Sequence, residues 1–259
     1  MPSRNAICAY VAAIALLLSP TLSAHATTFS PGNFVTYNQG EWGDTPAVAN
    51  AALLLQTNYP SVYASTFGVF EIGIPGASGF SIQFTNVGDL LNYLPSAGVP
   101  GPLTDDLQNP TMSPSGAFGG NVAALKLNVD FSDAGLLAHL PGITFGDLVL
   151  HDLTTASLNG LTVRQFLGLA NTALGGGSLP YSYDDLSLLT AFLDGSFDQG
   201  FVTQFAQDHL QVLQAPTSVP ESGSGLLLLF GLGALALSPS RRHLAGLAGR
   251  FAWRNRGQS

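Results

Sequence analysis

The chain of 259 residues is long enough for one large domain or two small ones, and it is 46% apolar but only 9% charged. Soluble proteins average about 25% charged residues, so the composition excludes a uniformly soluble chain and indicates unlike regions. Residues 27–215 hold two basic and fifteen acidic side chains, a formal charge of −13. This charge excludes nucleic acid and anionic membrane surfaces as partners and favours cations or neutral polymers such as polysaccharide, although acidity also serves solubility alone.

Residues 1–26 have the pattern of a secretory signal peptide. A positively charged start precedes an apolar core over residues 12–18, and Ala24 and Ala26 supply the small-x-small cleavage pattern. A buried N-terminal helix is the alternative. The only cysteine, Cys8, lies in this segment, so the mature protein would have no disulfide, no cysteine metal ligand and no thiol nucleophile.

Short apolar runs separated by turn residues predict strands in the first part of the body, residues 27–120. We expect a strand and turn over 34–44 and two strands over 66–74 and 79–85. Pro75 and Gly76 lie between these two strands and predict the turn that joins them.

A short helix is predicted next, with Asn86 as its N-cap and its end before Pro95. The proline-rich residues 98–120 are typical of a long loop. Over residues 121–133, polar and apolar side chains alternate, which predicts a strand with one buried face.

Residues 142–153 predict another strand, and two helices follow it. Thr162 is the expected N-cap of a helix over 163–174, which has apolar residues at i, i+3, i+4, i+7 and i+11. Ser182 is the expected N-cap of a helix over 183–194, with aspartates in its first turn. Residues 197–213 predict a further helix before a linker.

The C-terminal segment is apolar and is followed by arginines. Residues 222–240 carry no charge and would span about 28 Å as a helix, close to the thickness of the hydrocarbon core of a membrane, about 30 Å. Under the positive-inside rule, Arg241 and Arg242 would stay in the cytoplasm, and the N-terminal signal would place the body outside.

Val219, Pro220 and Glu221, then the apolar segment, then Arg241 and Arg242, resemble the PEP-CTERM sorting signal of Gram-negative bacteria. The resemblance implies processing by a membrane protease of the exosortase type, transient contact with the inner membrane, and delivery to the cell surface or an exopolysaccharide matrix. A permanent C-terminal membrane anchor is the alternative.

The body itself is similar, over 79–200, to segments of secreted bacterial surface proteins of unassigned function. The similarity is carried by residues 94–135 and 161–177. It implies one continuous domain and an extracellular location, and it assigns no site.

Motifs for catalysis are absent from the sequence. There is no Gly-x-Ser-x-Gly nucleophile elbow, phosphate loop or dinucleotide fingerprint in the body. The body histidines His139, His151 and His209 are far apart in the chain. The pair His151-Asp152 has no catalytic partners in the sequence and is more typical of a turn or surface position than of a catalytic site.

Carboxylates gather at two places that could bind a hard cation such as calcium. The candidate ligands are Asn128, Asp130, Asp133, Asp194 and Asp198, although turns and helix ends are the commoner places for such residues.

Aromatic residues beside polar, proline or glycine residues are typical of sugar-stacking platforms, although core packing is the more general use of aromatics. They are Tyr37, Trp42, Tyr59, Tyr63, Tyr181 and Tyr183.

Together these patterns predict an α+β fold with a β-rich N-terminal part, a C-terminal helical pair and a short C-terminal transmembrane helix. We divide the chain into a signal peptide (1–26), an extracellular globular domain (27–214) and a linker with the sorting signal and basic tail (215–259). The predicted function is that of a non-catalytic surface or matrix protein that is adhesive or associated with exopolysaccharide. An extracellular glycan-active enzyme and a calcium-dependent adhesive module are the alternatives.

Overall fold

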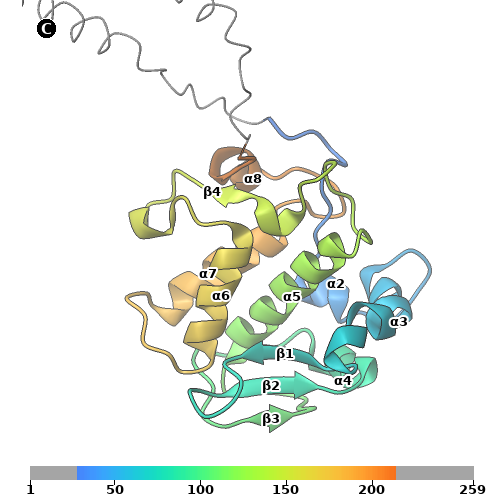
Figure 1. Ribbon diagram of the computed structural model, residues 1–259, viewed down its shortest axis with the longest axis vertical. Coiled ribbons are helices and arrows are strands. Elements are labelled where there is room, and N and C mark those ends of the chain that lie inside the picture. The colour runs from blue at the N-terminus through green and yellow to red at the C-terminus, as the bar shows by residue number, and fades with distance from the viewer. Residues whose placement is uncertain (1–27, 214–259) are drawn as a thin grey trace, which may run out of the picture. The chain divides into compact units, whose positions relative to one another are not determined.

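Helix α5 (Gly116–Asp133) runs through the middle of the protein in the computed structural model, which describes residues 28–213 (Figure 1). Fourteen of its 18 residues are buried, so the helix is covered on all sides. The fold is a mixture of helices and strands arranged around it.

The strand predicted over 121–133 is wrong, because this segment belongs to α5. A helix that is buried all round has no polar face, so its sequence carries no signal at the helical period of 3.6 residues. The apparent alternation arose from three polar residues with separate roles. Asn128 is buried, whereas Lys126 and Asp130 form an ion pair along the helix with an Nζ–Oδ2 distance of 2.9 Å.

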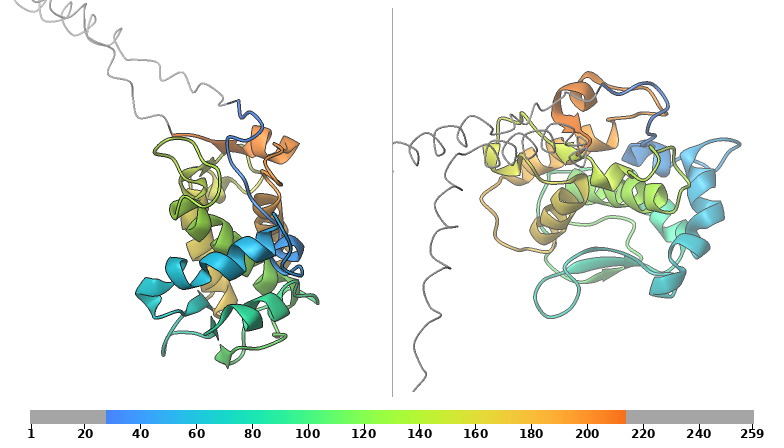
Figure 2. Two further views of the ribbon diagram at one scale, coloured as in Figure 1. Left: turned by 90° about the vertical axis from the view of Figure 1, so that its right-hand side faces the viewer. Right: turned by 45° about the horizontal axis from the view of Figure 1, so that its top comes forward.

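The described residues contain seven α-helices, five short strands and three short 3-10 helices, Ala64–Thr66, Phe145–Asp147 and Ala156–Leu158. In chain order the α-helices and strands are α2 (Gln39–Trp42), α3 (Ala51–Val62), β1 (Phe70–Gly73), β2 (Ser81–Phe84), α4 (Val87–Tyr93), β3 (Leu107–Gln108), α5, β4 (Val149–Leu150), α6 (Val163–Leu174), α7 (Tyr183–Asp194), α8 (Gln204–His209) and β5 (Leu210–Gln211). Helices α2 and α3 lie on one flank of α5, and α6 and α7 on the other (Figures 1 and 2).

A three-stranded sheet in the order β1-β2-β3 lies across one end of α5 and α6 (Figure 1). Strands β1 and β2 are antiparallel, with Phe70 opposite Phe84, and β3 adds in parallel with Leu107 opposite Ile82. The strands predicted over 66–74 and 79–85 are therefore confirmed. The side chains of Phe70, Phe84 and Ile82 are buried, so this sheet closes one end of the core.

Three helices begin at the caps that the sequence predicts. The side chain of Asn86 accepts a hydrogen bond from the backbone of Asp89 at the start of α4. Thr162 does the same from Gln165 in α6, and Ser182 from Asp185 in α7. Each side chain satisfies a backbone N–H group that has no partner within its own helix, which is why these residues set the helix starts.

The N-terminal part contains more helix than predicted. The segment 34–44, predicted as a strand and turn, contains α2, because Asn38 and Glu41 form a reciprocal capping box. Helix α3 was not predicted either. It begins at the N-cap Asn50 and contains Pro60 in its last turn, so its sequence looks interrupted.

Other predicted elements are shorter than expected. Only Val149–Leu150 of the strand predicted over 142–153 is a strand, and it pairs with β5. The helix predicted over 197–213 is reduced to α8. The loop predicted over 98–120 contains β3 and the first residues of α5.

The buried amide of Asn128 joins four parts of the fold. Its Oδ1 accepts hydrogen bonds from the backbone N–H of Tyr37 at 2.9 Å and from the indole Nε1–H of Trp42 at 3.2 Å. Its Nδ2 donates to the carbonyl oxygen of Tyr37 at 2.8 Å and to Oδ1 of Asp194 at 3.2 Å. One side chain of α5 thus holds the N-terminal segment, α2 and α7.

Within residues 28–213, no helix combines the length and the hydropathy that crossing a membrane requires. The signal peptide predicted for 1–26, with Ala24 and Ala26, lies outside the described residues. So do the linker, the sorting motif, the apolar segment and the basic tail predicted for 215–259.

We expect Asn128→Ala to lower the free energy of unfolding by about 3–5 kcal/mol, because it leaves the backbone of Tyr37 and the indole of Trp42 buried without partners. Urea unfolding of the body measures this change. The control is Asn58→Ala, which removes one hydrogen bond to Leu54 within α3 and should cost less than about 1 kcal/mol. Equal losses in the two variants would contradict a joining role for Asn128.

Candidate functional site

A groove with a cavity volume of about 550 Å³ lies between α7, α8 and the loop that contains residues 153–158. Leu188 and Phe192 of α7 line it and are 56% and 46% exposed, respectively. The opposite face of α7 buries Leu193 in the core, and the buried Leu186 lines the floor of the groove. Helix α7 therefore offers apolar side chains on two faces, one toward the core and one toward the groove.

Three ring side chains form a continuous aromatic wall in this groove. The rings of Phe192 and Phe205 are stacked with their centroids 5.1 Å apart and an angle of 18° between their planes. The imidazole of His209 lies 5.0 Å from the ring of Phe205. A partly exposed aromatic wall of this kind offers a surface to the C–H groups of a ligand.

Polar groups line the rim of the groove. Tyr181 contributes its hydroxyl, which lies 3.0 Å from Oγ of Ser157. Asp185 accepts a hydrogen bond from the hydroxyl of Ser182, and both carboxylate oxygens of Asp208 accept from the side-chain amide of Gln204. No lysine or arginine of the described residues lines the groove. Its rim therefore accepts hydrogen bonds and carries negative charge.

The structure divides the aromatic residues that the sequence predicted as sugar platforms. Trp42, Tyr59 and Tyr63 are buried in the core, so the prediction is wrong for them. Tyr181 lines the groove. Tyr183 is partly buried and packs against Phe118, with ring centroids 6.0 Å apart.

Phe192 and Phe205 were missed. Phe192 lies between the apolar residues Ala191 and Leu193, whereas Phe205 follows the polar Gln204 and met the criterion that suggested the other aromatics. A signal did exist for Phe192. It follows Leu188 at i+4, on the face of the helix opposite to the buried Leu193. Two large apolar residues on the exposed face of an amphipathic helix indicate a second contact surface.

The structure separates most of the predicted cation ligands. Asp130 pairs with Lys126 and accepts a hydrogen bond from the hydroxyl of Tyr63 at 2.9 Å. Asp133 binds the guanidinium of Arg164 through both oxygens, at 2.6 and 2.8 Å. Burial by itself would raise the pKa of Asp133, but the hydrogen bonds from Arg164 and Thr144 bring that pKa below its ordinary value.

Asn128 and Asp194 do meet, but as part of the buried network. Oδ1 of Asp194 accepts from Asn128, and its Oδ2 is buried without a hydrogen-bond partner. Burial raises the pKa of Asp194 well above its ordinary value, so the carboxyl group is neutral over a wider pH range than an exposed aspartate. A neutral carboxyl group is a poor ligand for a cation.

Asp198 lies on the segment that bridges to Thr36, and its Oδ1 is also buried without a partner. Within residues 28–213, no three histidine, cysteine or carboxylate side chains converge on a metal position. Calcium binding remains a prediction.

The predicted pair His151-Asp152 lies at the surface, with Nδ1 of His151 2.9 Å from Oδ2 of Asp152. The structure brings His209 beside it, because the backbone N–H of His151 donates to the carbonyl oxygen of His209. His139 lies elsewhere, with Nδ1 near the carbonyl oxygen of Leu140.

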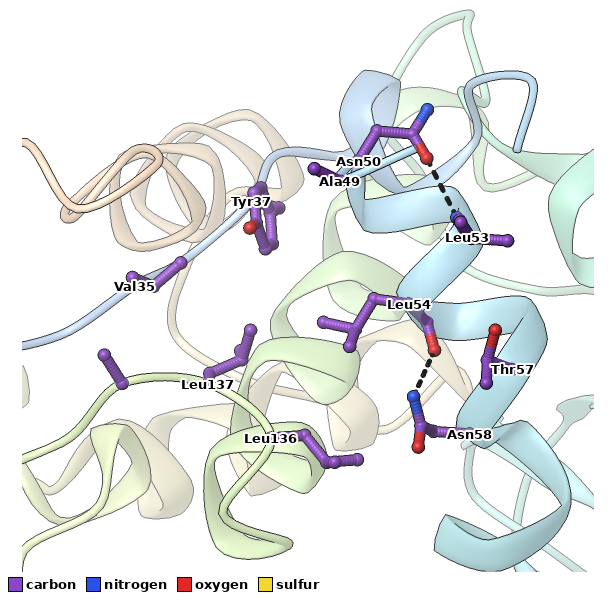
Figure 3. Close-up of a pocket in the computed structure, with 11 residues that line it drawn as sticks. Val35, Tyr37, Ala49, Asn50, Leu53, Leu54, Thr57, Asn58, Leu136 and Leu137 are labelled. Atoms are coloured by element: carbon purple, nitrogen blue, oxygen red, sulfur yellow. Dashed lines mark hydrogen bonds between the residues drawn. The ribbon is translucent and has the colours of Figure 1, made fainter. Parts of the chain in front are cut away.

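A second hollow, with a volume of about 430 Å³, lies between α3, the segment around Tyr37 and residues 136–138 (Figure 3). We call it the α3 slot. Tyr37, Ala49 and Asn50 also line a neighbouring hollow of about 370 Å³, together with Glu41, Asp44 and Gln199; we call this the acidic hollow.

Comparison with known proteins finds no match: no family model, no curated protein and no solved structure is significantly similar to this chain.

We expect Asp194→Asn to remove a pH dependence of stability. A carboxyl group whose pKa is higher in the folded than in the unfolded state contributes stability below its unfolded pKa, and this contribution is lost as the pH rises toward the folded pKa. The wild-type free energy of unfolding should therefore fall above about pH 4, where unfolded aspartate ionises.

The amide variant cannot ionise and should lack this fall, so the wild type should lose stability relative to the variant as the pH rises from about 4 to about 7. Urea unfolding at several pH values measures the difference. The same pH slope in both proteins would show that folding does not raise the pKa of Asp194.

Proposed function

We propose that this protein is a non-catalytic, exported surface or matrix protein that binds neutral polysaccharide in the groove between α7 and α8. The observation that carries the proposal is the aromatic wall of Phe192, Phe205 and His209 beside a rim of carboxylate and hydroxyl groups. A sugar ring has apolar C–H faces and hydroxyl donors, and these two features match the wall and the rim.

The charge of the body supports a neutral ligand. Residues 27–215 carry a formal charge of −13, and the groove has Asp185 and Asp208 on its rim. An anionic polymer would be repelled by this surface, whereas the hydroxyl groups of a neutral glycan would donate hydrogen bonds to the carboxylates.

The proposed route to the outside rests on the two ends of the chain. The signal peptide would direct export through the inner membrane. The PEP-CTERM-like motif at Val219, Pro220 and Glu221 would then be processed by an exosortase-type protease while the short C-terminal transmembrane helix holds the chain. Arg241 and Arg242 would hold the tail on the cytoplasmic side. A glycan-active enzyme and a calcium-dependent adhesive module remain predictions of the sequence.

We expect Phe192→Ala to weaken binding to a neutral polysaccharide about tenfold, since an aromatic contact contributes about 1–1.5 kcal/mol. Electrophoresis through gels that contain dextran, guar galactomannan or the anionic polymer alginate measures binding as retardation. The control is Phe201→Ala, which removes a phenylalanine that is 72% exposed and does not line the groove.

Equal retardation of the two variants by a neutral polymer, or stronger retardation by alginate than by any neutral polymer at low salt, would contradict the groove as a neutral glycan site. Release of new reducing ends from the polymer would favour the enzyme instead.

We expect the mature protein to end near Pro220-Glu221 when it is expressed in a Gram-negative host with an active exosortase. Cell fractionation followed by mass spectrometry of the C-terminal peptide measures the end. The control is Pro220→Ala, which should retain Ser259 and stay in the membrane fraction. A wild-type chain that keeps Ser259 in the membrane would show a permanent anchor.

A further inference from the structure

The α3 slot has an apolar wall. Val35, Leu54, Leu136 and Leu137 line it from three segments, and Figure 3 shows the side chains of Leu54, Leu136 and Leu137 around the same space. Val35, Leu54 and Leu136 are only partly buried although they pack against the core. The slot can therefore cover an apolar group of a ligand.

The slot adjoins the acidic hollow, because Tyr37, Ala49 and Asn50 line both. Glu41 and Asp44 line the acidic hollow, and Glu41 accepts a hydrogen bond from the side-chain amide of Gln199 at 2.8 Å. The two hollows together present an apolar wall at one end and carboxylates at the other.

Within residues 28–213, no lysine or arginine forms an ion pair with Glu41. Asp198 lies next to Glu41, and its Oδ1 is buried without a hydrogen-bond donor. Burial raises the pKa of Glu41, and the nearby Asp198 raises it further. The hydrogen bonds from Asn38 and Gln199 act in the opposite direction, but the pKa stays above its ordinary value. Burial also raises the pKa of Tyr37, and so do Glu41 and Asp198.

The two basic side chains of the described residues are occupied elsewhere. Lys126 pairs with Asp130, and Arg164 pairs with Asp133. Within residues 28–213, neither lysine nor arginine is therefore available to neutralise the carboxylates of Glu41 and Asp198.

We propose that the α3 slot and the acidic hollow together bind an organic ammonium ion with an apolar body. The apolar body would lie against Leu54, Leu136 and Leu137, and the ammonium group would donate hydrogen bonds to Glu41 and Asp44. An inorganic cation has no apolar part to cover the leucines. An apolar wall next to carboxylates therefore favours an alkylammonium ion. This site shares no residue with the groove between α7 and α8 and does not depend on the glycan proposal.

Isothermal titration with hexylammonium, hexan-1-ol, hexanoate and calcium chloride tests the proposal on the body, residues 27–214. We expect hexylammonium to bind about tenfold more tightly than hexan-1-ol, because a hydrogen bond to a charged group contributes about 1.5 kcal/mol or more. Hexanoate should not bind. Binding should weaken as the pH falls and Glu41 becomes protonated.

Glu41→Gln should reduce the affinity for hexylammonium to that for hexan-1-ol, and it keeps a side chain that can complete the capping box with Asn38. Leu54→Gln should weaken the binding of hexylammonium and hexan-1-ol alike. The matched control, Glu71→Gln, neutralises a carboxylate that lies outside both hollows on the sheet and should change neither affinity.

Equal affinities of the wild type for hexylammonium and hexan-1-ol would overturn the proposal. So would calcium binding that Glu41→Gln abolishes while hexylammonium does not compete, because the site would then serve an inorganic cation. A thermal melt of each variant shows whether it is folded. If Glu41→Gln is unfolded, Asp44→Asn replaces it with the same expected loss.

Discussion

The fold depends on the hydrogen bonds that one buried amide makes at the centre of the protein. Asn128 lies in the middle of α5 and satisfies the N–H and C=O groups of Tyr37, the indole of Trp42 and one oxygen of Asp194. A buried polar group without partners costs about 1–3 kcal/mol, so these groups favour the one arrangement in which all of them meet. Apolar packing around α5 would tolerate other arrangements, whereas this network specifies one.

The groove, the α3 slot and the acidic hollow all include residues of elements that this network holds in place. Asp194 is the last residue of α7, and the other face of α7 carries Leu188 and Phe192 into the groove. Tyr37 is bound through its backbone, which leaves its side chain to line the α3 slot and the acidic hollow. The strained backbone at the acidic hollow, where Ala49 and Gln199 have positive φ angles of 66° and 50°, is held by the surrounding fold.

Local signals were enough to predict several elements. The caps Asn86, Thr162 and Ser182 act within one turn of the helices they begin, and the strands around Phe70 and Phe84 are joined by a short turn. The candidate site was harder to predict. Tyr181 was identified from its neighbours in the sequence, but Phe192 and Phe205 meet only because α7 and α8 fold against each other.

The sequence by itself determined the starts of α4, α6 and α7, the hairpin of β1 and β2, the acidity of the body and the division of charge along the chain. These features depend on neighbouring residues or on composition alone. Only the tertiary structure decided that residues 121–133 form a helix, that Asn128 and Asp194 belong to a core network, and that the carboxyl groups of Glu41 and Asp198 lie side by side near Tyr37. The physical reason is burial. A helix that is covered on all sides loses its periodic pattern, and the state of a polar group depends on groups that are distant in the chain.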